Sequence, residues 1–248
     1  MFSQTLLLFL ASALGGITVL VIRRPNPTSF RLLLTFSGGY LFSIAFLHIL
    51  PELFLLHSNA RVAGLYVLIG FFLHIFIEFF SKGVEHGHMY EINQEEPRNS
   101  IKPLTLMAAL FVHAFSDGII LNDPSVHLHH HHHTNTLLIG ILLHKVPESF
   151  ALASILTKFI NSKSQVLIYL LIFALAAPLG LLGSNYVSQQ QWLPAQVSLA
   201  LWGIVGGSLV NIATTIFFEA NPNHQLNNHK FIASLAGAGM AVICEFFL

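Results

Sequence analysis

Apolar runs long enough to cross a lipid bilayer as helices recur along almost the whole chain. A helix needs about 17 to 25 apolar residues to span the hydrocarbon core. Of the 248 residues, 54% are hydrophobic and 9% are charged, whereas a soluble domain has about a quarter charged residues. The sequence therefore predicts an all-α, polytopic integral membrane protein with eight transmembrane helices, near residues 4–22, 32–50, 63–81, 104–121, 136–157, 166–185, 195–218 and 231–248.

The connections between these runs are too short to fold as a second domain, so we expect one transmembrane domain over residues 1–248. The longest connection, 82–103, is polar and contains Gly and Pro, which is typical of a loop. The connection 122–135 contains six histidines. The first apolar run begins uncharged and its arginines follow it, so we interpret it as a retained span rather than a signal peptide.

The positions of lysine and arginine predict which side of the membrane each loop faces. Cytoplasmic loops collect positive charge, and nine of the eleven Lys and Arg residues lie at odd-numbered connections. Only Arg61 falls at an even-numbered connection, and Lys145 lies within a span. We therefore expect both termini outside the cytoplasm, the 82–103 loop inside and the 122–135 loop outside. Because the Lys and Arg residues are distributed over several membrane loops, they form no single basic patch, and we expect no nucleic-acid partner.

One spacing, a carboxylate four residues after a histidine, occurs in four of the expected spans. It appears in HILPE at 48–52, HIFIE at 74–78, HAFSD at 113–117 and HKVPE at 144–148. Residues four apart on a helix share a face, so each pair can contact one ion. The pairs at 113–117 and 144–148 fall inside the bilayer, where ionisable groups are costly and commonly mark an ion path.

The two central pairs together offer two imidazoles and two carboxylates. This nitrogen and oxygen set suits zinc and is acceptable to iron(II), cobalt or manganese. Two carboxylates also balance a divalent cation where uncompensated charge is expensive. The single cysteine, Cys244, excludes an intrachain disulfide and a Cys-based metal motif. A site without thiolates need not hold its ion permanently, which favours passage over storage.

The outer pairs are open to more than one interpretation. His48 and Glu52 lie near the outer end of a span, where an interfacial pair and a part of a transport pathway are equally compatible with the sequence. His74 and Glu78 have apolar neighbours, and we interpret them as structural. Glu245 lies near the end of the last span and is expected to be solvated.

With these residues in view, the chain resembles the ZIP (Zrt/Irt-like protein) family of divalent metal transporters. The resemblance rests on AFLHILPE at 45–52, GFFLHIFIE at 70–78, HAFSDG at 113–118, HKVPESFAL at 144–152 and APLGLLG at 177–183. It implies a 3+2+3 helix bundle and uptake of zinc into the cytoplasm by alternating access, with Fe²⁺, Mn²⁺, Cd²⁺ and Co²⁺ as other candidate substrates. It implies no permanent cofactor and no enzymatic activity, and it leaves a homodimer open.

The resemblance also implies which residues bind the metal. The site between the fourth and fifth helices falls on His113, Asp117, His144 and Glu148. Family members with two adjacent metals supply further ligands at three positions that here hold Ala114, Lys145 and Ala177. Two ligands are missing and the third is an ammonium group, which repels a second cation. We therefore expect a mononuclear site.

Histidines in the two polar loops are candidates for metal capture. They are His86 and His88 on the inner side, and His127, His129, His130, His131, His132 and His133 on the outer side. The outer run is equally compatible with simple low complexity. The compact chain favours a prokaryotic inner membrane.

Three other functions are alternatives to transport into the cytoplasm. An intramembrane zinc-dependent hydrolase needs an open metal position for water, but the chain lacks the HExxH signature. The helix count disfavours an exporter of the cation diffusion type. A metal sensor or a purely structural membrane protein would bind metal without flux.

Overall fold

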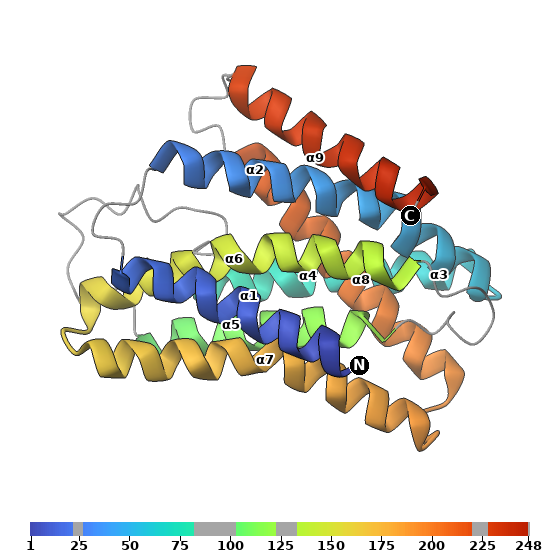
Figure 1. Ribbon diagram of the computed structural model, residues 1–248. Coiled ribbons are helices and arrows are strands. Elements are labelled where there is room, and N and C mark those ends of the chain that lie inside the picture. Colours follow the sequence, from blue (N-terminus) through green and yellow to red (C-terminus); the bar gives the residue numbers. More distant parts are fainter. Residues whose placement is uncertain (22–26, 82–102, 123–132, 220–227, 248) are drawn as a thin grey trace.

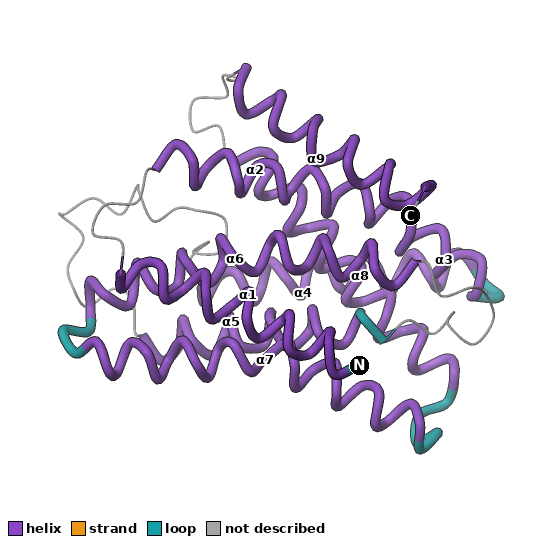
Figure 2. Tube along the Cα trace, viewed as in Figure 1, coloured by secondary structure: helices purple, strands orange, loops and turns teal. Residues whose placement is uncertain are grey.

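The computed structural model describes residues 1–21, 27–81, 103–122, 133–219 and 228–247, and these are helices joined by short turns (Figure 2). The prediction of an all-α protein is confirmed. The elements are α1 (Phe2–Val21), α2 (Pro27–Ile44), a π-helical turn η1 (Ala45–Ile49), α3 (Leu50–Leu56), α4 (Ala60–Ser81), α5 (Pro103–Ile120), α6 (His133–Phe159), α7 (Lys163–Gln189), α8 (Ala195–Glu219) and α9 (Asn228–Phe247).

Eight helical rods correspond to the eight apolar runs, because α2, η1 and α3 form one continuous rod over 28–56. Within the described residues, seven rods are long and apolar enough to cross a membrane, and α5 supplies a shorter apolar helix over Leu104–Ile120. Both termini lie at the same end of the bundle (Figure 1), as an even number of crossings requires. The prediction of a polytopic membrane protein is confirmed.

The rods fall into two sets that pack mainly among themselves. The first set contains α1, α5, α6 and α7, and the second contains the α2–η1–α3 rod, α4, α8 and α9. Figure 1 shows α2 beside α9 at the top of the molecule, with α1, α6 and α7 below them. The face where the two sets meet, which we call the inter-set interface, is formed by contacts of α2 with α6, α4 and α8 with α5, and α6 with α9.

Glycines allow the helices within each set to approach backbone to backbone. A Cβ atom added at Gly118 of α5 would overlap the Ala177 carbonyl oxygen of α7, and one at Gly180 of α7 would overlap the Phe115 carbonyl oxygen of α5. The same reciprocal arrangement joins α2 to α9 at Gly39 and Gly237, and α4 to α8 at Gly70 and Gly207. Small residues of this kind favour close helix packing in lipid, so each set is tightly joined.

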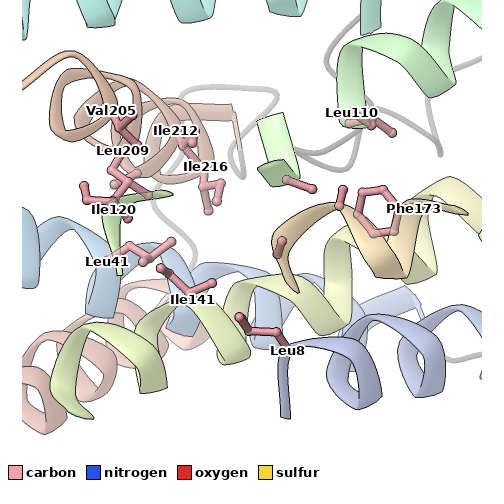
Figure 3. Packing of buried hydrophobic residues seen from close by; sticks show 14 of the residues in the cluster. Leu8, Leu41, Leu110, Ile120, Ile141, Phe173, Val205, Leu209, Ile212 and Ile216 are labelled. Atoms are coloured by element: carbon pink, nitrogen blue, oxygen red, sulfur yellow. The ribbon is translucent and has the colours of Figure 1, made fainter. Parts of the chain in front are cut away.

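The inter-set interface is packed differently, through side chains. Leu41 of α2, Ile141 of α6 and Ile120 of α5 are buried near one another, with Leu209 of α8 beside them (Figure 3). At Gly140 of α6 an added Cβ would meet side-chain atoms of α2, and no backbone atom is among its nearest neighbours.

Two hydrogen bonds cross the inter-set interface where α5 ends and α6 begins. The Tyr40 hydroxyl of α2 donates to the Thr136 carbonyl of α6 at 3.0 Å. The Trp202 Nε1 of α8 donates to the Ile120 carbonyl of α5 at 3.1 Å. The Ile120 carbonyl ends α5, where helix carbonyls lack intrahelical partners. Thr136 lies in the first turn of α6, so the two aromatic side chains tie one end of each helix to the second set.

We predict that Gly180→Ala destabilises the protein and that Gly183→Ala, three residues further along α7, does not. The first methyl group overlaps the α5 backbone, and overpacking of this kind costs about 1 to 3 kcal/mol. The second meets nothing within 4 Å and should raise helix propensity slightly. Thermal unfolding of both variants in detergent tests the pair, and equal melting temperatures would contradict it.

Candidate metal site

Antiparallel helices α5 and α6 bring three of the expected ligands together in the middle of the molecule. One ligand atom from each of His113, His144 and Glu148 lies within 4.8 Å of the others, and all three side chains are buried. The i, i+4 spacing of His144 and Glu148 places them on one face of α6. His113 approaches that face from α5.

The distances in this cluster match those of ligands that share one ion. The Nε2 atoms of His113 and His144 are 3.4 Å apart. Two imidazole nitrogens bound to one tetrahedral zinc, each at about 2.0 to 2.1 Å, are separated by about 3.3 Å. Glu148 completes the cluster, with Oε1 3.5 Å from His113 Nε2 and Oε2 3.9 Å from His144 Nε2.

Asp117, the fourth expected ligand, lies beside the cluster and is paired with a lysine. The Lys145 Nζ is 2.5 Å from Asp117 Oδ2 and 2.5 Å from Glu148 Oε2. Asp117 Oδ2 is also 3.5 Å from His113 Nε2. Lys145 is fully buried, and its ammonium lies 5.5 Å from the centre of the Phe173 ring of α7. Lys145 thus supplies positive charge to two buried carboxylates, and the aromatic face adds to its stabilisation.

Ala114 and Ala177 are both buried and offer no side-chain donor atom. The Ala177 backbone packs directly against Gly118 of α5, which leaves no space for a larger side chain on the glycine. The three positions where two-metal family members have further ligands therefore hold two apolar side chains and one cation in this chain.

His48 is buried, and it contacts residues of α9 and α8 that its sequence neighbourhood did not predict. Its Nδ1 lies 3.3 Å from Glu245 Oε1 of α9, and its ring is edge-on to Trp202 with 6.3 Å between ring centres. The Glu245 side chain is 6% exposed, so the expectation that it is solvated was wrong. Glu52 is half-buried on α3.

The π-helical turn η1 explains part of this arrangement. Pro51 follows the turn, and a proline ring clashes with the carbonyl four residues before it in a regular helix. The wider turn over Ala45–Ile49 accommodates the proline, and π-helical turns are frequent at functional sites. His48 lies within this turn.

His74 lies nearer to the site than its interpretation as a structural residue suggests. It is buried on α4, and its ring is edge-on to that of His113 with 5.1 Å between the ring centres. In the sequence, the only feature that links His74 to the metal ligands is the shared spacing of a histidine and a carboxylate four residues later.

The loop histidines predicted to capture metal fall almost entirely outside the described part of the chain. His86, His88, His127, His129, His130, His131 and His132 lie outside the described residues, and His133 begins α6 with its side chain undescribed.

Comparison with known proteins identifies the family. The sequence matches the model of the ZIP zinc transporter family over residues 2–105 and 91–245. The chain belongs to this family.

Curated relatives are similar to parts of the chain. The protein zntD of Dictyostelium discoideum is 27% identical over 173 residues, which cover 65% of this chain and 25% of that protein. The zinc transporter ZIP9-B of Xenopus laevis is 31% identical over 130 residues, covering 50% of this chain and 40% of that protein. The chain thus spans between a quarter and two fifths of the length of these relatives.

Membership of the ZIP family also bears on the alternatives. It is a family of transporters rather than enzymes, which agrees with the prediction that this ZIP chain is not an enzyme. The family therefore disfavours the intramembrane hydrolase.

For the buried His48–Glu245 pair, we predict that Glu245→Ala lowers stability by about 1.5 to 3 kcal/mol, the range for hydrogen bonds to charged groups. Glu52→Ala removes a half-buried carboxylate from the same region and should change stability by less than about 0.5 kcal/mol. Unfolding of the two variants in detergent measures the difference. A larger loss for Glu52→Ala would show that the pairing is assigned to the wrong carboxylate.

Proposed function

We propose that this chain carries a divalent metal ion across the membrane into the cytoplasm, with zinc as the favoured substrate. The ion would bind between α5 and α6, the fourth and fifth membrane rods. The main support is the buried cluster of His113, His144 and Glu148, in which the two imidazole nitrogens have the 3.4 Å spacing expected of ligands to one ion. Membership of the ZIP family provides independent support.

The ligand types favour zinc without excluding related metals. Imidazole suits zinc, copper, iron and nickel, whereas an oxygen-only site would suit magnesium, calcium or manganese. Fe²⁺, Co²⁺, Mn²⁺ and Cd²⁺ are the competitors to test. Because neutral imidazole and ionised carboxylate bind metal, protons compete with the ion, and we expect uptake to weaken in acid.

The proposed site holds one ion at a time. With Lys145 protonated and both carboxylates ionised, Asp117, Glu148 and Lys145 sum to a charge of −1. One divalent ion changes this sum to +1, and a second would raise it to +3 in a medium where net charge is costly. Lys145 therefore acts against a second metal, in line with the apolar side chains at Ala114 and Ala177.

Alternating access requires the ligands to face water on each side in turn. In the mechanism that we propose, the first set of helices moves against the second while carrying the ion. Reciprocal glycine contacts support this division, because they join helices within each set, whereas the inter-set interface is packed through side chains.

The proposed orientation in the membrane, and with it the direction of transport, rests on charge. Lys and Arg residues cluster at the odd-numbered connections, which favours both termini outside the cytoplasm. The setting that we propose is a prokaryotic inner membrane. There the 122–135 loop would collect ions outside, and His86 and His88 would accept them inside.

We predict that Glu148→Gln abolishes saturable zinc-65 uptake into proteoliposomes, because it removes a carboxylate that both binds the ion and balances its charge. Glu52→Gln, which changes a carboxylate of α3 outside the cluster, should leave the zinc affinity of the core site unchanged even if it slows uptake. Unlabelled iron(II), manganese, cobalt and cadmium added as competitors would rank the substrates. Tight zinc binding by the wild type without any flux would replace the transporter with a sensor.

A second prediction concerns the number of ions and the role of Lys145. Protein with the loop histidines His86, His88, His127 and His129 to His133 replaced by serine should bind one zinc in the membrane core. Lys145→Met should destabilise the metal-free protein by about 3 to 5 kcal/mol, because it leaves buried carboxylates uncompensated. Added zinc should restore much of that loss and raise the melting temperature more than in the wild type. Two core ions in the protein that retains Lys145 would overturn the mononuclear site.

A further inference from the structure

A third histidine, His74, lies at the metal cluster, and it comes from the opposite set of helices. It belongs to α4 in the second set, whereas His113 and His144 belong to the first. Its side chain is 1% exposed, while its neighbours Leu73 and Ile75 are 44% and 42% exposed. Helix α4 therefore turns this one polar residue inward. The His74 ring contacts the His113 ring edge-on across the interface.

We propose that His74 is a direct ligand of the transported ion, supplied across the inter-set interface. This inference rests on the proposed function. It adds a residue from α4 to a site otherwise built from α5 and α6.

The ring positions agree with three imidazoles around one ion. An imidazole bound through nitrogen at about 2.0 to 2.1 Å places its ring centre about 3.2 Å from the metal, so two such rings at a tetrahedral angle have centres about 5.2 Å apart. The ring centres of His74 and His113 are 5.1 Å apart, and those of His113 and His144 are 5.7 Å apart. Both pairs are edge-on rather than stacked.

The ligand count gives a second reason. Zinc takes four ligands in closed protein sites, but Asp117, the fourth expected ligand, lies outside the group of ligand atoms that the other three form. Among the described residues, the group with ligand atoms within 4.8 Å of one another contains His113, His144 and Glu148, so His74 has to approach this group when the ion binds. His74 would complete four with a nitrogen, which shifts the preference toward zinc and away from oxygen-seeking manganese.

The experiment compares His74→Phe, which keeps an aromatic ring against His113, with the wild type. Both carry the serine replacements of the loop histidines, and His57→Gln, which removes an imidazole from the turn before α4, is the control. Zinc K-edge absorption of full-length protein with substoichiometric zinc should show three imidazoles per ion in the wild type and the control, and two in His74→Phe. In proteoliposomes, the ratio of zinc to manganese uptake should fall at least about tenfold, since even groups behind a metal ligand have that effect on affinity.

His74→Cys keeps the test decisive where His74→Phe folds poorly. A ligand at this position predicts a zinc–sulfur distance of about 2.3 Å in its absorption spectrum, together with stronger competition by cadmium. A wild-type spectrum with two imidazoles, an unchanged uptake ratio in His74→Phe, or no sulfur ligand in His74→Cys would overturn the role of His74. Absence of zinc uptake by the wild type would instead overturn the proposed function, so the two failures are distinguishable.

Discussion

The cost of burying charge in a low-dielectric interior is the constraint on which the centre of this structure depends. Lys145 and the carboxylates of Asp117 and Glu148 are all buried within a membrane domain, where an isolated charge would cost several kcal/mol. Their 2.5 Å ion pairs compensate one another, which requires α5 and α6 to face each other with α7 closing over Lys145 through Phe173. The same requirement limits how much further charge an incoming ion can add.

Sequence reasoning could reach the parts of this architecture that depend on local periodicity. Bilayer thickness fixes the length of a span, so the apolar runs coincide with the rods, and the i, i+4 spacing places His144 and Glu148 on one face of α6. Contacts between distant helices carry no such signal. The pairing of His48 with Glu245 and the approach of His74 to His113 follow from how α9 and α4 pack, which no local spacing encodes.

A ligand from each side of the inter-set interface would link metal binding to the relative position of the two sets. The ion would then be held most tightly in the arrangement where His74 meets His113, and it would lose one ligand when the sets move apart. Lower affinity after movement is what release requires, because a ligand shifts an equilibrium only by its differential affinity for the two states.

The hydrogen bonds of Tyr40 and Trp202 have a consequence for the populations of the metal-free protein. Each crosses the inter-set interface, and a hydrogen bond contributes about 1 kcal/mol net. If both break when the sets slide, they favour the present arrangement by about 2 kcal/mol, or roughly thirtyfold in an equilibrium constant. The metal-free protein would then populate mainly the present arrangement of the two sets. Substitutions at Tyr40 or Trp202 would change the fraction of molecules in each arrangement without altering a metal ligand.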